Sequence, residues 1–326
     1  MKAVQLKAFG GSENLVTSEV EKPTITSTQI LIKVSFSGIN YADTYIRKGA
    51  FPGLPTPPFT LGMEGSGIVE LVGNDVKNFQ VGELVAFAGN QTYAEYVIID
   101  TQSTQPWEVA VPVTLQKDIA SSIAMSARTA MLLTYRVNHA QNKIALVHGA
   151  AGSVGSVLVQ LLKKQGYTVI GLIGSDDKYS FVKELGSDIV LNYKNPGLNK
   201  TIFQQFPEGL DLIFNATGGD TIARDIELLA ENGHIIWYSF AQSNQAPQLE
   251  SAISNAFMKS IKFEVFNGGS VCRQDNIRAI KEVEELIQNN ELKIHIHSHY
   301  PLDCAFLAHE ELEQGQTQGK LLLQVE

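Results

Sequence analysis

The chain has 326 residues, of which 44% are hydrophobic and 18% charged, with a formal net charge of −9 at pH 7. This length predicts about two domains, and the acidic charge without basic clusters argues against a nucleic-acid partner. No run approaches the ~18 apolar residues of a membrane span, and the N-terminus lacks a signal-peptide core. The two cysteines, Cys272 and Cys304, offer no disulfide framework. We therefore expect a cytoplasmic protein with no membrane partner.

The first hundred residues predict short strands separated by turns. Residues 4–8 alternate between apolar and polar side chains, and residues 30–35 form a stronger strand. Four prolines in residues 51–58 predict a loop, and glycines recur among apolar pairs in residues 62–82. Glycine at this density indicates bulges and tight corners, hence a small, bent β-barrel. Residues 118–137 hold helix formers without a breaker and are predicted to be helical.

The central pattern is a strand, a glycine-rich turn and a helix. Residues 144–147 are apolar, and apolar positions recur with helical spacing after the turn until a second strand begins at residue 167. The turn reads Ala150-x-Gly152-x-x-Gly155, a dinucleotide-binding pattern with alanine in place of its first glycine. Gly152 permits close approach of a pyrophosphate, and Gly155 permits close packing of helix on strand. The helix N-terminus then faces the phosphates.

Strands and helices alternate through the second half of the chain. The predicted strands are residues 144–147, 167–173, 188–193, 211–216, 233–238 and 261–266. Each is an apolar run, as burial on both faces of a sheet requires, so we predict a doubly wound parallel sheet. After a helix at 276–288, the segments 293–299, 303–313 and 320–325 read as strand, helix and strand. They break the alternation, so the tail is expected to return to the first domain.

Five segments carry motifs that are specific when taken together. They are GINYADTYIRKGAFP (38–52), GMEGSGIVELVGNDVKNFQVGELV (62–85), YAEY (93–96), VHGAAGSVG (147–155) and YPLDCAFLAHEELEQGQTQGKLLL (300–323). With them the chain resembles the medium-chain dehydrogenase/reductase superfamily, and within it the zinc-independent, zeta-crystallin-like quinone oxidoreductases. The resemblance implies an α/β protein with a GroES-like β-barrel catalytic domain (1–122 and 272–326) and a Rossmann domain (123–271). It also implies a homodimer, in which strand 261–266 would cover its exposed edge.

Zinc is not expected. Zinc-binding relatives hold the catalytic ion with two cysteines and a histidine. Where the resemblance places a cysteine and the histidine, this sequence has Asn40 and Met63, neither of which is a normal zinc ligand. His295, His297 and His299 share one face of a predicted strand, and we interpret them as its solvated face.

The end of the second predicted strand favours NADPH over NADH. Domains that prefer NAD place an acidic residue there, on the ribose hydroxyls. The resemblance aligns this place with Ile173, followed by Gly174 and Ser175, so no carboxylate stands there to repel a 2′-phosphate. Ser175 is able to donate a hydrogen bond to that phosphate, and Lys178 to pair with its charge.

The same turn also carries competing signals. Ser175 suits a helix N-cap, and Asp176 and Asp177 bring negative charge near the expected phosphate. Tyr193 matches the ring that the family places against the adenosine. The other cofactor contacts implied by the resemblance are Thr129, Ser153, Val154, Gly155, Ser156, Asn215, Ser239, Phe240, Phe266 and Asn267.

Without a metal, hydrogen-bond donors have to stabilise the charge that develops on the acceptor. This favours quinones or enones, because their conjugation delocalises the charge. The candidate catalytic residues are Asn40, Tyr45 and Arg47, with Asp43 as an orienting partner. In the competing interpretation, Asp43 and Arg47 form a structural ion pair and Tyr45 only packs.

Tyr41, Phe51 and Met63 predict an apolar, aromatic pocket for a flat ring. Enoyl-thioester reductases of the family use a tyrosine as proton donor where this chain has Phe51, and a phenyl ring donates no proton. Three functions remain open: an NADPH-dependent quinone or enone reductase, a reductase of other activated double bonds or aldehydes (enoyl thioesters included), and a low-turnover NADPH-binding structural or regulatory protein.

Overall fold

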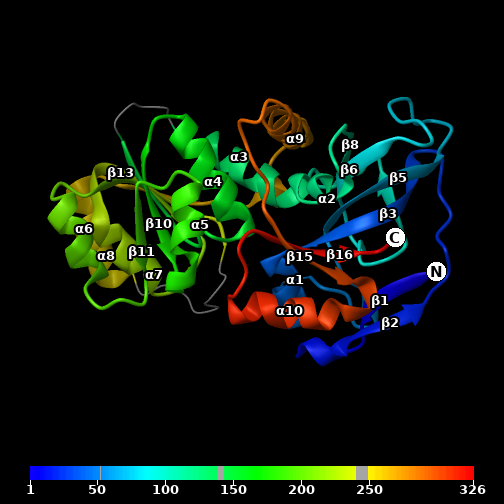
Figure 1. Cartoon of the computed structure of the whole chain (residues 1–326), viewed down its shortest axis with the longest axis horizontal. Helices are drawn as coiled ribbons and strands as arrows, with labels where there is room; N and C mark the ends of the chain where they lie inside the picture. The colour runs from blue at the N-terminus through cyan, green and yellow to red at the C-terminus, as the bar shows by residue number, and fades with distance from the viewer. Residues whose placement is uncertain (52, 138–142, 240–248) are drawn as a thin grey trace. The chain divides into compact units, whose positions relative to one another are not determined.

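The computed structural model describes residues 1–51, 53–137, 143–239 and 249–326. These residues form two compact units, unit 1 (Met1–Leu132 with Gly269–Glu326) and unit 2 (Leu133–Gly268). Figure 1 colours both along the chain. The first boundary lies inside helix α3 (Arg128–Thr134), which contributes residues to both units. It lies within the ten residues to which the boundary at 122/123 was predicted.

Unit 2 is built on a six-stranded parallel sheet with the order β11-β10-β9-β12-β13-β14. In chain order the strands are β9 (Ile144–Val147), β10 (Thr168–Ile173), β11 (Ile189–Asn192), β12 (Leu210–Asn215), β13 (Leu229–Trp237) and β14 (Lys262–Val265). Numbered from the first strand, this is the 3-2-1-4-5-6 order of a Rossmann fold. The doubly wound sheet predicted from the apolar runs is confirmed.

Helices connect these strands. They are α4 (Ser153–Lys164), α5 (Tyr179–Glu184), α6 (Leu198–Gln205), α7 (Thr221–Leu228) and α8 (Glu250–Lys259), with a 3₁₀ turn η3 (Asp176–Lys178) before α5. Leu146, Ile170, Ile213 and Ile235 are completely buried at the centre of this unit. The inner strands β9 and β10 are therefore largely apolar and buried, whereas the edge strand β14 carries Lys262 and Glu264 and is mostly exposed.

Unit 1 contains a seven-stranded sheet and a smaller three-stranded one. The large sheet follows the path β15-β16-β3-β5-β6-β8, with β7 also paired to β3, and the small sheet has the order β2-β1-β4. The strands are β1 (Lys2–Leu6), β2 (Leu15–Glu19), β3 (Gln29–Ile39), β4 (Phe59–Thr60), β5 (Glu64–Val72), β6 (Leu84–Ala88), β7 (Tyr96–Asp100), β8 (Val109–Pro112), β15 (Ile296–Pro301) and β16 (Lys320–Gln324).

Strand β3 organises this unit, because it pairs with β5, β7 and β16. Its register with β5 shifts twice, as the glycine pattern predicted. At Gly67 a Cβ atom would lie 2.2 Å from the Lys33 carbonyl oxygen, so only glycine permits this close approach. The C-terminal strand β16 runs antiparallel to β3, with Leu321 opposite Ile39. The tail thus returns to the first part of the chain.

The helices and 3₁₀ turns of unit 1 lie between and after these strands. They are η1 (Ser12–Asn14), α1 (Tyr41–Arg47), α2 (Lys117–Ala120), η2 (Ile123–Ala127, a π-helix), α3 as above, η4 (Gly268–Ser270), α9 (Arg273–Gln288), η5 (Leu302–Cys304) and α10 (Ala305–Gln314). No helix of the described residues is long and apolar enough to cross a membrane.

The segment 118–137, predicted to be helical, is largely helical but not one regular helix. The structure divides this segment into α2, the π-helix η2 and α3. The Ser121 hydroxyl donates to the Asp118 carbonyl at 2.6 Å, and the Met125 N–H donates to the Glu64 carboxylate at 2.9 Å. These contacts take backbone groups away from a regular helix. Tertiary hydrogen bonding therefore overrides local propensity here.

Candidate active site

Asn40 lies where the longest strand of unit 1 passes into a helix. It follows β3 and is the N-cap residue of α1, with extended φ and ψ of −115° and 153°. The Asp43 carboxylate accepts a hydrogen bond from the Asn40 backbone N–H at 2.8 Å. This contact satisfies a donor at the helix start and fixes the backbone of Asn40.

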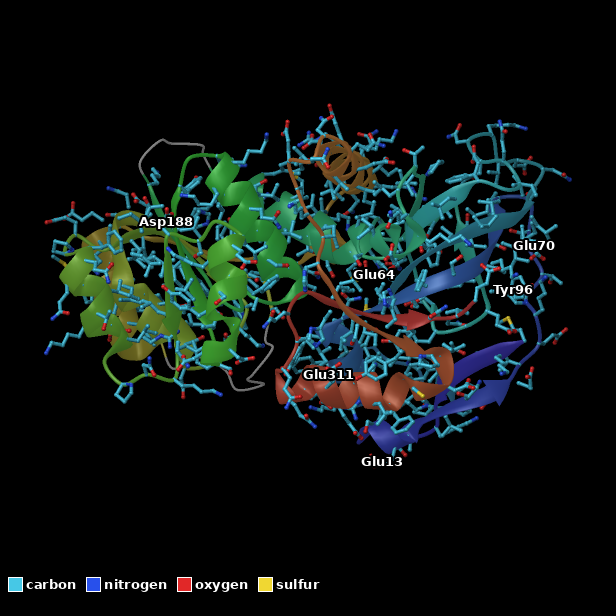
Figure 2. The ribbon with its side chains drawn as sticks, in the orientation of Figure 1. Glu13, Glu64, Glu70, Tyr96, Asp188 and Glu311 are labelled. Carbon is cyan, nitrogen blue, oxygen red and sulfur yellow. The ribbon has the colours of Figure 1, made fainter. Side chains whose placement is uncertain are left out.

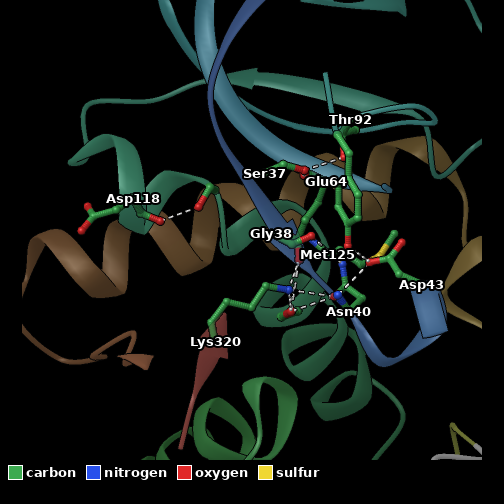
Figure 3. Close-up of polar contacts among 12 residues, drawn as sticks. Ser37, Gly38, Asn40, Asp43, Glu64, Thr92, Asp118, Met125 and Lys320 are labelled. Atoms are coloured by element: carbon green, nitrogen blue, oxygen red, sulfur yellow. Dashed lines mark hydrogen bonds and ion pairs between the residues drawn. The ribbon is translucent and has the colours of Figure 1, made fainter. Parts of the chain in front are cut away.

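The Asn40 side chain belongs to a buried polar network (Figure 3). The Lys320 ammonium donates to the Asn40 Oδ1 atom and to the Ser126 hydroxyl, both at 2.8 Å, and pairs with the Glu64 carboxylate. The other Glu64 oxygen accepts from the Met125 N–H. Both charged side chains are at most 1% exposed. All three N–H donors of the ammonium are therefore satisfied inside the protein.

Gly38 leaves the space that this network occupies. A Cβ atom on Gly38 would lie 2.8 Å from the Cε atom of Lys320 and 2.9 Å from the Cγ atom of Glu64. It would also lie 2.8 Å from the Ser121 carbonyl oxygen. A glycine at this place in β3 thus lets the lysine and glutamate side chains meet against the strand.

A second series of buried hydrogen bonds runs from Asp43 through Tyr93 to His309. The Tyr93 hydroxyl donates to the Asp43 carboxylate at 3.2 Å and lies 3.1 Å from the His309 Nε2 atom. Since the single hydroxyl proton is used on Asp43, His309 is the donor in the second contact. Tyr93, Asp43 and His309 are completely buried. These hydrogen bonds therefore join α10 to the start of α1.

Burial controls the protonation of this chain. It raises the pKa of the Asp43 carboxyl to about 7, against the lowering effects of the Asn40 N–H, Lys320 and Tyr93. Burial, with a smaller contribution from nearby Arg47, lowers the pKa of His309 to about 3. The imidazole is thus neutral at physiological pH, whereas the pKa of Asp43 lies near physiological pH.

The structure separates the other candidates on α1. The buried Arg47 guanidinium pairs with Glu313 of α10 at 2.5 Å, so its partner is not Asp43. Tyr45 is 7% exposed, and burial raises the pKa of its hydroxyl. The Tyr41 and Tyr45 rings lie 5.9 Å apart. Arg47 is held as a link between two helices, whereas Asn40 and Asp43 meet at the end of β3.

One cavity of about 300 Å³ opens in unit 1 beside β4. This is the lower end of the volumes of small-molecule sites. Met63 lines it, whereas neither Tyr41 nor Phe51 does. Phe51 is 37% exposed. The lining residues are Ile46, Gly53, Leu54, Pro55, Phe59, Thr60, Leu61, Gly62, Met63, Asn90 and Gln91.

In unit 2 the glycine-rich turn has the shape that a dinucleotide needs. Gly149 takes a positive φ of 58°, and Gly152 is the N-cap of α4 without a side-chain cap. A Cβ atom on Gly155 would lie 2.2 Å from the Gly149 carbonyl oxygen. The turn therefore requires glycine for close packing and leaves its phosphate-facing side open.

Backbone donors follow this turn. The Ser156 N–H donates to the Gly152 carbonyl at 2.9 Å, so the N–H groups of Ser153, Val154 and Gly155 precede the first bond of the helix. They carry the positive end of the helix dipole. Ala150 is completely buried and donates its N–H to the Leu172 carbonyl. It ties the turn to β10.

The residues expected near a 2′-phosphate gather at the end of β10. The Ser175 hydroxyl donates to Asp177 within the same turn. A Cβ atom on Gly174 would lie 2.6 Å from the Tyr193 hydroxyl oxygen, so the ring covers this glycine. Lys178 is only 7% exposed. Burial lowers its pKa, Asp177 raises it, and Lys194 lowers it further.

Asn215 shapes the loop after β12. Its side-chain amide donates to Thr221 at 2.9 Å and to Asp225 at 2.6 Å, and its oxygen accepts from the N–H groups of Thr217 and Gly218. All four hydrogen-bonding sites of the side chain are therefore used within unit 2.

The remaining predicted contacts lie on several elements. Thr129 is half-buried on α3, and the backbone oxygen of Ser239 accepts from the Trp237 indole at 2.5 Å. Phe266 is buried after β14, and Asn267 is exposed. Phe240 lies outside the described residues.

Comparisons with known proteins identify the family. Residues 26–109 match the alcohol dehydrogenase GroES-like domain, and residues 153–288 match the zinc-binding dehydrogenase domain. A quinone oxidoreductase of Mus musculus is 28% identical over 331 residues, covering 99% of this chain and 97% of its own. Escherichia coli quinone oxidoreductase, solved with NADPH, is 26% identical with a TM-score of 0.90 and full coverage of both chains. Prostaglandin reductase-3 of Mus musculus is 31% identical over 220 residues, 67% of this chain and 57% of its own.

The chain belongs to the medium-chain dehydrogenase/reductase superfamily. The quinone oxidoreductases of Mus musculus and Escherichia coli within it match over nearly their full length. The resemblance seen in the sequence motifs is thereby confirmed, as is the combination of a GroES-like domain with a Rossmann sheet.

The residues of this superfamily member do not fit a zinc ion where zinc-binding members hold one. The Asn40 amide and the Met63 thioether are poor zinc ligands. The Lys320 ammonium bonds to Asn40 and pairs with Glu64, so a positive charge already lies among these side chains. Among the described residues, no group of three His, Cys, Asp or Glu side chains is arranged to hold a metal.

The three histidines predicted on one strand face have separate surroundings in this dehydrogenase-like fold. His297 contacts Glu311 of α10 at 3.2 Å, a residue labelled in Figure 2. His299 lies 3.9 Å from Asp118. Burial lowers the pKa of His295, and His297 lowers it further.

Sequence reasoning missed the partners of Asn40 in this medium-chain reductase fold. Glu64 and Lys320 were not singled out, because charged residues are normally exposed. Each nevertheless carried a signal, since Glu64 stands among glycines and apolar residues and Lys320 opens the apolar run LLL. It also missed His148 at the end of β9, whose Nε2 atom lies 2.8 Å from the buried Asp225 carboxylate.

We predict that Asp43→Asn changes how stability depends on pH. Because the folded pKa of about 7 lies above the ordinary 3.8, the native state binds the proton more tightly than the unfolded state. Asp43 therefore costs stability as pH rises from about 4 to about 7. The variant should gain on the order of 3 kcal/mol relative to wild type over this range, at about 1.4 kcal/mol per pKa unit. Urea unfolding at pH 5 and pH 8 measures this, and an equal difference at both pH values would contradict it.

Proposed function

We propose that this protein is an NADPH-dependent, zinc-independent oxidoreductase that reduces a quinone or an α,β-unsaturated carbonyl compound. The observation that carries the proposal is the buried network at the end of β3, which presents the Asn40 side chain where zinc-binding relatives use a metal. Its full-length quinone oxidoreductase relatives, one of them solved with NADPH, support the same activity.

Unit 2 supplies the cofactor site in this proposal. The turn at Gly149–Gly155 fits a pyrophosphate, because glycine keeps the backbone accessible and the following N–H groups point outward. Lys178 provides the positive charge for a 2′-phosphate, and Tyr193 a ring for the adenosine end. Bound NADPH supplies a hydride, and a proton completes the two-electron reduction to a hydroquinone.

Unit 1 supplies the acceptor site. Asn40 donates a hydrogen bond to the acceptor oxygen, where negative charge develops as the hydride arrives. Asp43 holds the backbone of Asn40 in place. A quinone tolerates such modest help, because its conjugated ring spreads the charge and takes its proton from water. The cavity beside β4, which is lined by Met63 and Phe59 but not by Asn40, offers an apolar surface for the ring.

Enone reduction is the second candidate activity. Prostaglandin reductase-3 matches 67% of this chain, and an enone needs the same donor to its carbonyl oxygen. The enoyl-thioester and aldehyde alternatives receive less support, because Phe51 has no hydroxyl to donate a proton. A low-turnover NADPH-binding role would need the same glycine-rich turn, and turnover alone separates it from the enzymes.

We further propose that the protein is a cytoplasmic homodimer joined through β14. This strand lies at the edge of the sheet, with Val265 63% exposed. On α8, Ile253, Phe257 and Met258 are 57%, 83% and 77% exposed. An apolar patch beside an open sheet edge is typical of a subunit interface. A second copy of β14 would extend the sheet and cover the patch.

The activity test is NADPH oxidation followed at 340 nm after treatment with EDTA. We expect oxidation that depends on 1,4-benzoquinone, survives chelation and prefers NADPH to NADH. A simple enone serves as the parallel acceptor and ranks the two candidate activities. Tight NADPH binding without turnover of either acceptor would instead support the low-turnover role.

Lys178→Ala tests the cofactor assignment. Loss of a charge-assisted contact with the 2′-phosphate should raise KM for NADPH about tenfold or more and leave KM for NADH nearly unchanged. The matched control is Lys200→Ala, which removes an exposed lysine on α6 of the same unit. Equal effects of Lys178→Ala on both cofactors would contradict the assignment.

Phe257→Glu tests the dimer. A charge on this exposed position should disfavour the interface without disturbing the fold of the subunit. Light scattering should then report 35.6 kDa instead of twice that mass. Val81→Glu, which charges an exposed apolar position of unit 1, should remain a dimer. A wild-type monomer at micromolar concentration would rule the proposal out.

A further inference from the structure

The orientation of the Asn40 side chain is set by the ammonium on one of its atoms. Asn40 Oδ1 lies 2.8 Å from the Lys320 ammonium. It also lies 3.2 Å from the Ser126 hydroxyl, whose single proton has the Glu64 carboxylate as a second acceptor at 3.3 Å. The reversed amide would place its NH₂ group against the ammonium, so two sets of donors would face each other. Lys320 therefore determines which end of the amide faces the network.

The opposite end of the amide has hydrogen-bonding capacity to spare. The Nδ2 atom carries two N–H donors, and within the described part of the chain its one contact is the Gly38 carbonyl at 3.5 Å. This exceeds the ordinary range of about 2.7–3.2 Å for such bonds. Asn40 is 7% exposed. A buried amide with a weakly used donor is suited to a ligand oxygen.

We propose that Lys320 is a positioning residue for the reduction: it orients and polarises the Asn40 amide so that Nδ2 donates to the carbonyl oxygen of the acceptor. This inference rests on the proposed function, in which Asn40 contacts that oxygen. An ammonium on the amide oxygen draws electron density from the nitrogen and strengthens its N–H donors. Lys320 thereby strengthens the hydrogen bond from Asn40 to the acceptor oxygen without contacting the acceptor itself.

The surrounding residues keep the lysine in this place. Glu64 balances its charge, and the Met125 N–H in turn holds Glu64. Gly38 leaves the volume that both side chains fill. The ammonium also donates to Asn40 and Ser126. A buried ammonium needs an acceptor for each of its three N–H groups in either role, so variants that separate stability from turnover are needed to distinguish positioning from stabilisation.

The first test separates stability from turnover. Lys320→Met leaves Glu64 buried without its partner, so both the melting temperature and kcat should fall. Lys320→Met/Glu64→Met replaces the pair by apolar side chains, which restores much of the melting temperature. In this double variant kcat with benzoquinone should stay roughly ten- to a hundredfold below wild type, the scale of a weakened oxyanion donor. KM for NADPH should remain unchanged.

Three variants serve as comparisons. Lys33→Met removes an exposed lysine of β3 that pairs with Glu326, and it should keep the wild-type kcat. Asn40→Ala removes the proposed donor and should lower kcat by a similar or larger factor. When Lys320→Met/Glu64→Met is added to Asn40→Ala, kcat should fall by less than about threefold more, because the lysine acts through the amide.

A spectroscopic measurement tests the orientation without cofactor or acceptor. The side-chain ¹⁵N–¹H₂ resonances of Asn40, assigned from their loss in Asn40→Ala, should move upfield in Lys320→Met/Glu64→Met, as their polarisation is lost. They should stay in place in Lys33→Met. Unchanged resonances in the double variant would overturn the inference.

The outcomes keep the two proposals apart. If the double variant recovers kcat together with its melting temperature while Asn40→Ala stays slow, Lys320 is only structural and the proposed function stands. If Asn40→Ala keeps the wild-type kcat, Asn40 is not the donor and the positioning role falls with it. If wild type reduces neither acceptor, the proposed function fails, and the resonances of Asn40 still report whether Lys320 polarises it.

Discussion

The buried ion pair between Lys320 and Glu64 is the interaction on which the candidate active site depends. It joins the start of β16 to the start of β5, with Asn40 after β3 and Ser126 in η2 completing its hydrogen bonds. Removing one partner of such a pair costs about 3–5 kcal/mol, because the other charge is left buried. The geometry of Asn40 is therefore tied to the integrity of the whole first unit.

Much of the architecture could be predicted from local patterns. The strands of unit 2 were predicted from apolar runs, and burial on both faces explains the pattern of inner strands such as β9 and β10, although not that of the exposed edge strand β14. The glycine-rich turn was equally visible, since its residues are consecutive. The interruption of the helical segment 118–137 could not be predicted from local sequence. It involves a hydrogen bond from the Met125 N–H to Glu64, which lies 61 residues earlier in the chain.

The site could be predicted only in part from the sequence, for the same reason. Asn40 and Asp43 are three residues apart and fall within one recognisable motif, so they were found. Tyr93 and His309, which support Asp43, are 216 residues apart, and neither shows a local pattern that pairs them. The sequence does not tell whether Arg47 is a catalytic or a structural residue, because its charge suits both roles. The structure pairs it with Glu313, so that it links α1 to α10.

The return of the C-terminal strand to β3 has a consequence for how the protein matures. Lys320 lies 280 residues after Asn40 in the chain. During synthesis, Glu64 and Asn40 therefore emerge from the ribosome long before Lys320, which neutralises Glu64 and orients Asn40. Until β16 docks, the first unit contains a carboxylate that resists burial, which favours an open barrel. The docking of β16 on β3 is therefore the step that brings the ammonium to Glu64 and Asn40.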